Sequence, residues 1–292
     1  MISFGNKNVT SLSVGGNSVV SAYFGDKKIW PTMVQSGTVT TTVMVDGSDT
    51  LTREGTGLTT FSIAFTFDSG TMAIDWGDNS STVITVNNQD ASGVYVHKYS
   101  NVGTYTVKYT FTDVGNLSPG STVRESSLKR IDDFNIKMHS LDHLCCDRLG
   151  LEYVDPEIFI KSETINVFGA FANCVSLKSP VRDWGYVWTA SYAYEGCIGM
   201  TGSVPEWGDN ILLAGFAYKG CTGLTGTIPA WGANIIETSF TYEDCTGLTA
   251  CSSALLLNPM PAWITSHNSC VTGCVDNIRK HFTADWGGTK AS

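Results

Sequence analysis

Hydrophobic and polar residues alternate along short stretches of the first 113 residues, and glycine-containing turns separate the stretches. This alternation has the period of a β-strand with one buried face. In residues 1–30 it predicts four short strands, at 2–4, 9–14, 19–24 and 29–30, separated by turns that suit tight hairpins. The turns are Gly5-Asn6, Gly15-Gly16-Asn17 and Gly25-Asp26. We therefore expect a small N-terminal β-meander over residues 1–32.

The first and third turns share a pattern, Phe4-Gly5-Asn6-Lys7 and Phe24-Gly25-Asp26-Lys27, so the hairpin is duplicated. A meander of this size is not stable alone and must pack on the next domain, on copies of itself or on a partner. Residues 19–30 resemble a short N-terminal module of structural and surface proteins of gut Bacteroidota and their phages. The resemblance implies an attachment module, and the candidate attachment residues are Phe4, Tyr23, Phe24 and Trp30.

Residues 33–118 have the pattern of a β-sandwich. Runs rich in β-branched and aromatic residues predict strands at 39–45, 60–67, 71–76, 82–86, 94–99 and 104–112. Two signatures lie among them: Asp75-Trp76-Gly77-Asp78-Asn79, and His97-Lys98-Tyr99 followed by Gly103-Thr104-Tyr105-Thr106-Val107. Together they resemble a PKD domain, an Ig-like fold. The chain departs from the family pattern at Trp76 and Asn79, which still suit a buried aromatic residue and a left-handed turn.

Asp78 and His97 are the ionisable residues of these signatures. Asp78 could bind a cation, but we favour a carboxylate that accepts backbone amide bonds and closes the turn. His97 is interpreted as a hydrogen-bonded structural residue, because the nearby sequence offers no second ligand and no catalytic triad. PKD-like domains carry no chemistry of their own, so the resemblance implies a spacer.

The second half of the chain repeats every 23 or 24 residues. Cys174, Cys197, Cys221 and Cys245 each follow an aromatic residue by three positions and precede Leu or Met by three. A degenerate earlier copy is plausible at residues 143–149, aligned on Cys146. Units of this length cannot bury an apolar face alone, so they must stack.

The motif [FY]-x-x-C-x-x-[LM] resembles the BspA-type leucine-rich repeats of bacterial and phage-associated surface proteins. The resemblance implies a solenoid over residues 119–265, with each cysteine free and buried beneath the aromatic residue. Stacked coils would also hold equivalent cysteines close enough that spacing alone does not forbid disulfides.

A Trp-Gly pair follows each of the first three repeat cysteines by ten residues, at Trp184, Trp207 and Trp231. These tryptophans can form a buried ladder inside the solenoid. Alternatively they project as an aromatic strip that stacks on sugar rings, because flat apolar rings with polar neighbours suit saccharide faces. The three residues are therefore the candidate glycan-binding site.

Residues 266–292 are expected to cap the open end, with a short amphipathic helix over 274–282. A metal site is a minor alternative here, because His267, Cys270, Cys274 and His281 fit no common zinc spacing. His139 and His143 beside Cys145 and Cys146 are a similarly weak candidate. We expect no metal and no cofactor.

Composition narrows the function classes. The chain of 292 residues carries a net charge of -9 and only 15% charged residues, without a basic stripe that would bind nucleic acid. No stretch of about 18 apolar residues predicts a membrane span. Walker, dinucleotide-binding, G-x-S-x-G and H-E-x-x-H motifs are absent from the sequence. Glu152, Asp155 and Glu157 cluster, but acids in a loop are usually solvated, so catalysis is not expected.

The expected architecture is mainly β and multidomain: meander, Ig-like spacer, solenoid and cap. Such modules act outside cells, yet the N-terminus has no signal-peptide pattern. A virion protein would resolve this conflict, because phage proteins assemble in the host cytoplasm and leave by lysis. The leading hypothesis is a non-enzymatic head or tail fibre or decoration protein of a tailed phage. Its partners would be other virion proteins, further copies of itself and host surface polysaccharide or protein. The alternatives are a bacterial cell-surface adhesin and, third, a surface glycan hydrolase.

Overall fold

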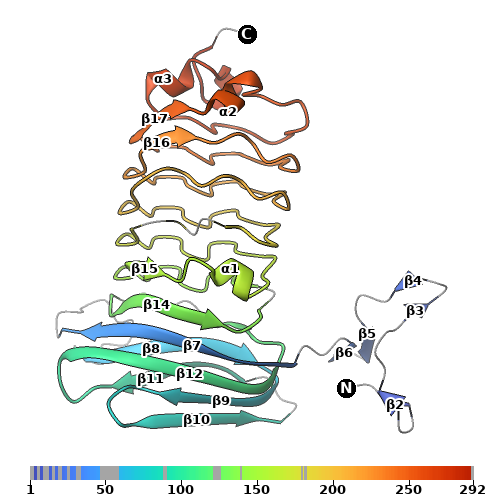
Figure 1. The fold of residues 1–292 in the computed structure, drawn as a ribbon, viewed down its shortest axis with the longest axis vertical. Helices are drawn as coiled ribbons and strands as arrows, with labels where there is room; N and C mark the ends of the chain where they lie inside the picture. Colours follow the sequence, from blue (N-terminus) through green and yellow to red (C-terminus); the bar gives the residue numbers. More distant parts are fainter. Residues whose placement is uncertain are drawn as a thin grey trace.

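The computed structural model describes residues 34–46, 59–87, 91–120, 126–138, 140–178, 180 and 183–290, together with short strand segments between Ser3 and Trp30. The fold is mainly β, as predicted, with a few short helices. A region of two β-sheets is followed by a stack of coils that ends at the C-terminus (Figure 1). We call residues 34–135 the two-sheet region and residues 140–290 the coil stack.

The described parts of the N-terminal segment pair as two-stranded ladders, and much of the predicted strands at 9–14 and 19–24 lies outside the described residues. Each ladder flanks one of the three predicted turns, and no pairing joins one ladder to the next among the described residues. The pairs are β1 (Ser3–Phe4) with β2 (Lys7–Asn8), β3 (Ser13–Val14) with β4 (Asn17–Ser18), and β5 (Ala22–Phe24) with β6 (Lys27–Trp30). The side chains of the candidate attachment residues Phe4, Tyr23, Phe24 and Trp30 lie outside the described part of the structure.

The two-sheet region contains the six strands predicted from alternation, each at or within a few residues of its expected position. One sheet has the order β10-β9-β12-β7-β14-β15 and the other has the order β11-β8-β13. The strands are β7 (Val34–Val45), β8 (Thr60–Phe67), β9 (Ser69–Asp75), β10 (Ser81–Val86), β11 (Ala91–Lys98), β12 (Gly103–Gly115), β13 (Ser118–Pro119), β14 (Leu128–Asn135) and β15 (Tyr153–Val154).

Aromatic side chains from both sheets meet in the core between them. Phe65 on β8 packs edge-on against Tyr109 and Phe111 on β12, with ring centroids 6.1 and 5.3 Å apart. Phe61 and Phe67 are also buried, because alternation places them on the same face of β8 as Phe65. The predicted alternation therefore describes the packed face of this sheet.

Strand β14 corrects the predicted boundary between residues 118 and 119. It belongs to the expected solenoid by sequence, yet it pairs antiparallel with β7, so the large sheet continues past the boundary. Its other edge pairs parallel with β15. Ile131 and Phe134 are buried on the face that closes the core. The two-sheet region and the coil stack are thus joined by one hydrogen-bonded sheet.

Parallel β-bridges link successive coils of the stack, one per coil. The column of bridged residues is Ser140, Asn166, Thr189, Leu213, Glu237 and Ser266. A second parallel pair, β16 (Gly226–Ile228) with β17 (Leu248–Cys251), lies farther along two of the coils. Short helices occur at α1 (Ile158–Lys161), α2 (Ser253–Leu257), α3 (Asp276–Arg279) and the 3-10 helix η1 (Ala284–Trp286).

The C-terminal region holds one more coil than the sequence predicts. Ser266 continues the bridge column, so the expected cap begins as a coil equivalent to those before it. The insertion after Leu248 forms α2, whose first turn is capped by the Ser252 hydroxyl accepting from the Leu255 amide at 3.2 Å. The expected helix over residues 274–282 is shorter, because only Asp276–Arg279 is helical.

Candidate functional site

The four coils aligned on Cys174, Cys197, Cys221 and Cys245 bury the same three side chains. Their aromatic residue, cysteine and Leu or Met are essentially inaccessible to solvent, whereas His143, Cys146 and Leu149 of the degenerate copy are only partly buried. Tyr194, Tyr218 and Tyr242 stack face to face, with ring centroids 5.5 and 5.9 Å apart. The repeat residues therefore build the interior, as predicted, and leave the surface to other positions.

The cysteines form a hydrogen-bonded ladder. Each thiol donates to the carbonyl oxygen of the residue at the aromatic position of the preceding coil, at 3.0 Å: Cys197 to Phe171, Cys221 to Tyr194, Cys245 to Tyr218 and Cys274 to Tyr242. All nine cysteines of the chain are described and carry free thiols, so the prediction of free, buried repeat cysteines is confirmed. Burial raises the pKa of the repeat thiols well above its ordinary value, which makes them poor nucleophiles and poor metal ligands.

The first coil has a different register from the one predicted. Cys174 lies eight residues after the bridged Asn166, and the same offset from Ser140 reaches Arg148 instead of Cys146. Cys145 consequently takes the aromatic position, and its carbonyl accepts the Cys174 thiol. Arg148 is buried, and desolvation lowers the pKa of its guanidinium to about 10.

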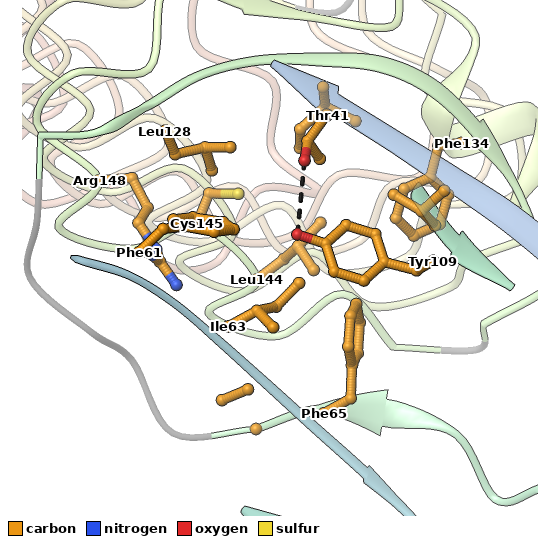
Figure 2. A pocket seen from close by; sticks show the side chains of 14 residues that line it. Thr41, Phe61, Ile63, Phe65, Tyr109, Leu128, Phe134, Leu144, Cys145 and Arg148 are labelled. Atoms are coloured by element: carbon orange, nitrogen blue, oxygen red, sulfur yellow. Dashed lines mark hydrogen bonds between the residues drawn. The ribbon is translucent and has the colours of Figure 1, made fainter. Parts of the chain in front are cut away.

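Arg148 helps to line a cavity of about 40 Å³ between the two sheets and the first coil (Figure 2). The walls are mainly apolar, and the Tyr109 hydroxyl lies 3.4 Å from the hydroxyl of Thr41. The Arg148 guanidinium lies 5.9 Å from the centre of the Phe61 ring. A space of this size holds about one water molecule and no organic ligand. The cavity is a feature of the junction between the regions.

The tryptophan column is buried, which corrects the glycan-binding prediction for these residues. Trp184, Trp207 and Trp231 are 1%, 7% and 8% exposed, so no sugar ring can reach their faces. Trp184 and Trp207 stack with centroids 5.6 Å apart. The indole of Trp207 donates to the Tyr242 hydroxyl at 3.1 Å, and that of Trp231 donates to the Pro259 carbonyl at 2.9 Å. The ladder interpretation is the correct one.

A different row of apolar side chains faces solvent along the edge of the stack. Trp188 is 54% exposed, Ile165 on the preceding coil and Ile236 two coils further on are also exposed, and Leu212 on the coil between Trp188 and Ile236 is half-buried. Their backbones stack directly: the Trp188 amide donates to the Ile165 carbonyl, the Leu212 amide to Trp188, and the Ile236 amide to Leu212, each at 2.9 Å. We call Ile165, Trp188, Leu212 and Ile236 the outer row.

A polar row runs beside the outer row. Tyr186, 57% exposed, lies two residues before Trp188, and Asn210 and Asn234 occupy the same position in the next two coils. The Asn210 side-chain amide donates to the Gly185 carbonyl at 3.0 Å, which fixes its orientation. Residues 183–190, 206–213 and 230–237 of these three coils contain acidic residues but neither lysine nor arginine. The edge therefore combines exposed rings, amides and carboxylates.

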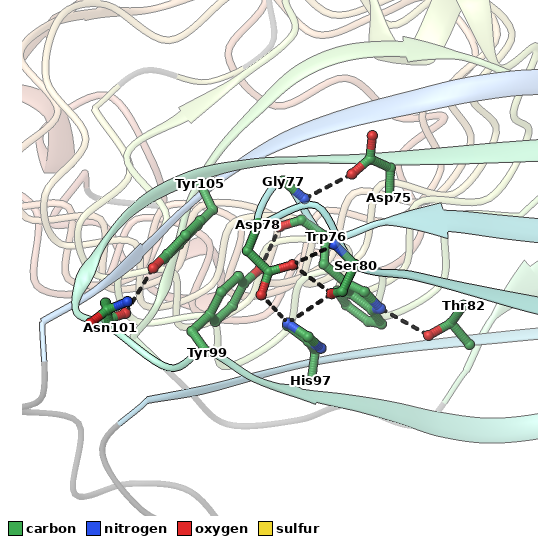
Figure 3. Close-up of polar contacts among 10 residues, drawn as sticks. All are labelled: Asp75, Trp76, Gly77, Asp78, Ser80, Thr82, His97, Tyr99, Asn101 and Tyr105. Atoms are coloured by element: carbon green, nitrogen blue, oxygen red, sulfur yellow. Dashed lines mark hydrogen bonds and ion pairs between the residues drawn. The ribbon is translucent and has the colours of Figure 1, made fainter.

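The turn residues of the PKD-like signature form a closed polar network (Figure 3). Asp78 accepts from the Ser80 amide at 3.0 Å, and its other oxygen lies 2.8 Å from His97 Nε2. The His97 ring stacks on the buried Trp76, and the Tyr99 hydroxyl donates to the Trp76 carbonyl at 3.0 Å. The hydroxyl of Ser80 and the ring of His97 lower the pKa of Asp78 to about 2. The predicted structural roles of Asp78 and His97 are confirmed.

The chain matches no known protein family, no curated protein and no solved structure. Function must therefore be argued from the geometry described above. Among the described residues, no group of three or more His, Cys, Asp or Glu side chains is placed to hold a metal ion, including the set around His267. His139, a member of the other candidate set, lies outside the described residues. The described helices include none with the length and apolar character needed to cross a bilayer.

In the acidic cluster near residue 155, the expectation of solvated acids is correct for Glu152 and Glu157, which are exposed, and wrong for Asp155. Asp155 is buried, accepts from the Phe134 and Glu157 amides, and pairs with the Lys161 ammonium at 2.8 Å. Lys161 also contacts Asp133 at 3.1 Å, which joins α1 to β14. The hydrogen bonds that the Lys161 ammonium donates to these carboxylates raise the pKa of Lys161 above its usual range. The cluster fastens the first coil to the large sheet.

Proposed function

We propose that the protein is a non-enzymatic structural protein of a tailed-phage virion, a head or tail fibre or decoration protein. Residues 1–32 dock it on the particle, and the coil stack adheres to glycan on the host surface. The resemblance of residues 19–30 to an attachment module of phage structural proteins supports the first role. The exposed outer row, presented on a rigid stack, is the observation that carries the second.

The folds that we assign to the two regions fit this role. The two-sheet region is a PKD-like, Ig-like spacer, an assignment supported by the Asp78, His97 and Tyr99 contacts around Trp76. The coil stack is a BspA-type leucine-rich-repeat solenoid, an assignment supported by the repeated thiol-to-carbonyl bonds and the column of parallel bridges. Both are presentation modules, one a spacer and the other a recognition surface.

The chemistry of the outer edge indicates a neutral polysaccharide as ligand. Tyr186 and Trp188 offer flat apolar rings, which stack on the C–H faces of sugars. Asn210 and Asn234 offer amides on the adjoining coils, and Asp209 offers a carboxylate, all exposed and able to bind sugar hydroxyls. An anionic glycan is disfavoured, because nearby charges in these coils are acidic.

Particle composition tests the virion role. Mass spectrometry of purified particles should detect the protein, and deletion of residues 1–32 should release it from the particle into the supernatant. Detection of the protein on the bacterial envelope and its absence from particles would instead support a cell-surface adhesin.

Glycan binding is tested separately with the purified full chain. A panel of neutral bacterial surface polysaccharides should include a ligand whose affinity falls at least tenfold in the Tyr186→Ala/Trp188→Ala variant, as measured by biolayer interferometry. Ile198→Ala is the matched control, because Ile198 is an exposed apolar residue of the same coil that lies outside both the outer row and the polar row. Equal binding by wild type and the double variant would refute the outer edge as the site.

A further inference from the structure

Strand β10 is an edge of the large sheet and lies at the opposite end of the molecule from the C-terminus (Figure 1). Within the described residues it pairs on one side only, with β9. Its register with β9 is unbroken over all six residues, from Ser81 opposite Asp75 to Val86 opposite Gly70. It is therefore a regular strand with one open hydrogen-bonding side.

The alternation of hydrogen-bonded pairs between β9 and β10 shows which backbone groups of β10 point away from the sheet. At the hairpin, the Trp76 amide donates to the Ser80 carbonyl at 3.1 Å. Hydrogen-bonded pairs alternate along an antiparallel ladder, so Thr82, Ile84 and Val86 bond to β9. The amides and carbonyls of Ser81, Val83 and Thr85 consequently point away from the sheet.

The other sheet edges carry features that discourage pairing with another chain, and β10 carries none of them. Strand β13 contains Pro119 and β11 ends in Lys98, whereas β15 lies within the coil stack, where the Lys178 amide of the next coil bonds to the adjacent Glu152 carbonyl. Proline, lysine, irregular register and covering segments are the usual protections of an edge strand. In β10 the residues are Ser, Thr, Val, Ile, Thr and Val, without charge or proline.

We infer that β10 is a self-association surface that pairs antiparallel with β10 of a second copy of this chain. Only a register centred on Val83 brings all three outward-facing residues of each copy into hydrogen-bonded pairs. Val83 then lies opposite Val83 of the second copy, and Ser81 lies opposite Thr85. Two large sheets become one continuous sheet with two-fold symmetry.

Side-chain chemistry favours this occupant over an unrelated strand. Val83 is 65% exposed on the outer face, and the two-fold axis brings it against an identical apolar side chain. Thr82 points inward, where its hydroxyl accepts from the Trp76 indole at 2.9 Å, so pairing leaves the core unchanged. No like charges within β10 are brought together.

The association state of the full chain tests this inference by sedimentation velocity between about 1 and 100 µM. The wild type should form a dimer that dissociates on dilution. Val83→Pro should be monomeric, because proline removes an outward-facing amide at a position where an edge strand tolerates it. Val83→Lys should also weaken the dimer at least tenfold, because it places two ammonium groups opposite one another.

Val96→Lys is the matched control. Val96 is an exposed valine on β11, the edge of the other sheet, so the same substitution there should leave the dimer intact. Far-UV circular dichroism and the melting temperature establish that each variant is folded. A wild type that is monomeric throughout, or a dimer unaffected by Val83→Pro, would overturn the inference whatever the outcome of the particle and glycan experiments.

Cysteine cross-linking tests the register. Val83→Cys should form an intermolecular disulfide, because paired Cα atoms about 5.5 Å apart are within disulfide range. Thr85→Cys should not, because the two Thr85 residues would be offset along the strands by about 14 Å. Efficient cross-linking of Thr85→Cys in place of Val83→Cys would refute the register centred on Val83.

Discussion

The two-sheet region and the coil stack are both built from extended chain, but different interactions hold them together. In the two-sheet region each strand pairs with its neighbour over many residues, for example β12 with β7 along nearly its full length. In the stack, successive coils are joined by separate backbone hydrogen bonds spread along each coil, for example from the Ala190 amide to the Leu213 carbonyl and from the Tyr194 amide to the Ala217 carbonyl, and by like side chains stacked on one another. The comparison teaches that the backbone pairs in continuous ladders in the first region, whereas in the second it pairs in separate bonds that accompany a repeated set of interior side chains.

The largest expected effect comes from breaking the strand that the two regions share. Ile131→Asp on β14 buries a carboxylate in the core, which should cost more than about 4 kcal/mol. We expect both regions to unfold in one transition when unfolding in urea is monitored by tryptophan fluorescence. Thr110→Asp, at an exposed position of β12, should have a much smaller effect. Separate transitions for the two regions would show that β14 does not couple them.

Trp184 and Trp188 lie in the same coil, one in the interior and one on the surface, so replacing each in turn compares the two positions. Trp184→Ala removes a buried ring and should cost about 3–5 kcal/mol of the free energy of unfolding. Trp188→Ala removes an exposed ring and should change it by no more than about 0.5 kcal/mol. Chemical denaturation of both variants is the measurement, and similar losses would contradict the assignment of the outer row to the surface.

A low pH should destabilise the two-sheet region through its Asp78–His97 network. The described interior of the stack has no counterpart of this network. The pKa of Asp78 is about 2 in the fold against 3.8 ordinarily, so its contribution is present above pH 4 and is lost as the pH falls towards 2. The carboxylate is partly exposed, so we expect a contribution of about 1 kcal/mol. Asp78→Asn should flatten the dependence of the melting temperature on pH in this window. If the melting temperature of Asp78→Asn fell with pH as steeply as that of the wild type, the result would count against the Asp78–His97 contact.

The smallest expected effect is on the rate at which the cysteine thiols react with a reagent. Cys146 is half-buried and the remaining eight cysteines are buried, so a thiol reagent such as DTNB should label at most one residue in the native protein. Labelling should be slow at pH 8, because burial raises the pKa of Cys146 to about 11. All nine should react in denaturant. Rapid native labelling of several thiols would contradict the buried ladder.

The sequence predicts much of this fold, and its failures have physical causes. Strands such as β8 and β12 follow strict alternation and were placed within a few residues of their observed ends. Strand β14 was missed because its buried residues, Leu128, Ile131 and Phe134, are three apart. Two register shifts along its pairing with β7 turn all three side chains inward, and such irregularities leave no pattern of period two.

The register of the first coil was misassigned for a related reason. Neighbouring cysteines at positions 145 and 146 favoured alignment on Cys146, whereas the bridge column places Arg148 at the cysteine position. A buried arginine cannot be recognised from the repeat motif. Its position depends on the two-sheet region, whose Phe61 ring lies near the guanidinium.

The regular spacing of Trp184, Trp207 and Trp231 left both a buried ladder and an exposed glycan-binding strip open, and burial decides for the ladder. In this stack regular spacing marks the interior. The available signal was the apolar pair in consecutive repeats, Ile211-Leu212 and Ile235-Ile236, of which only the first member is buried. Trp188 occupies the second position of such a pair, after the buried Val187.

Strand β14, which the two regions share, also determines how the molecule would respond to mechanical tension. Strand β7 is the first strand of the large sheet and runs antiparallel to both β12 and β14. Val34 and the end of β14 that leads into the coil stack lie at the same end of the β7–β14 ladder, because Thr38 pairs with Asn135. Tension between Val34 and the coil stack would therefore open this ladder from that end, one hydrogen bond after another. A chain anchored through its N-terminal segment and bound to a surface through its coils would load the β7–β14 pairing before the rest of the large sheet.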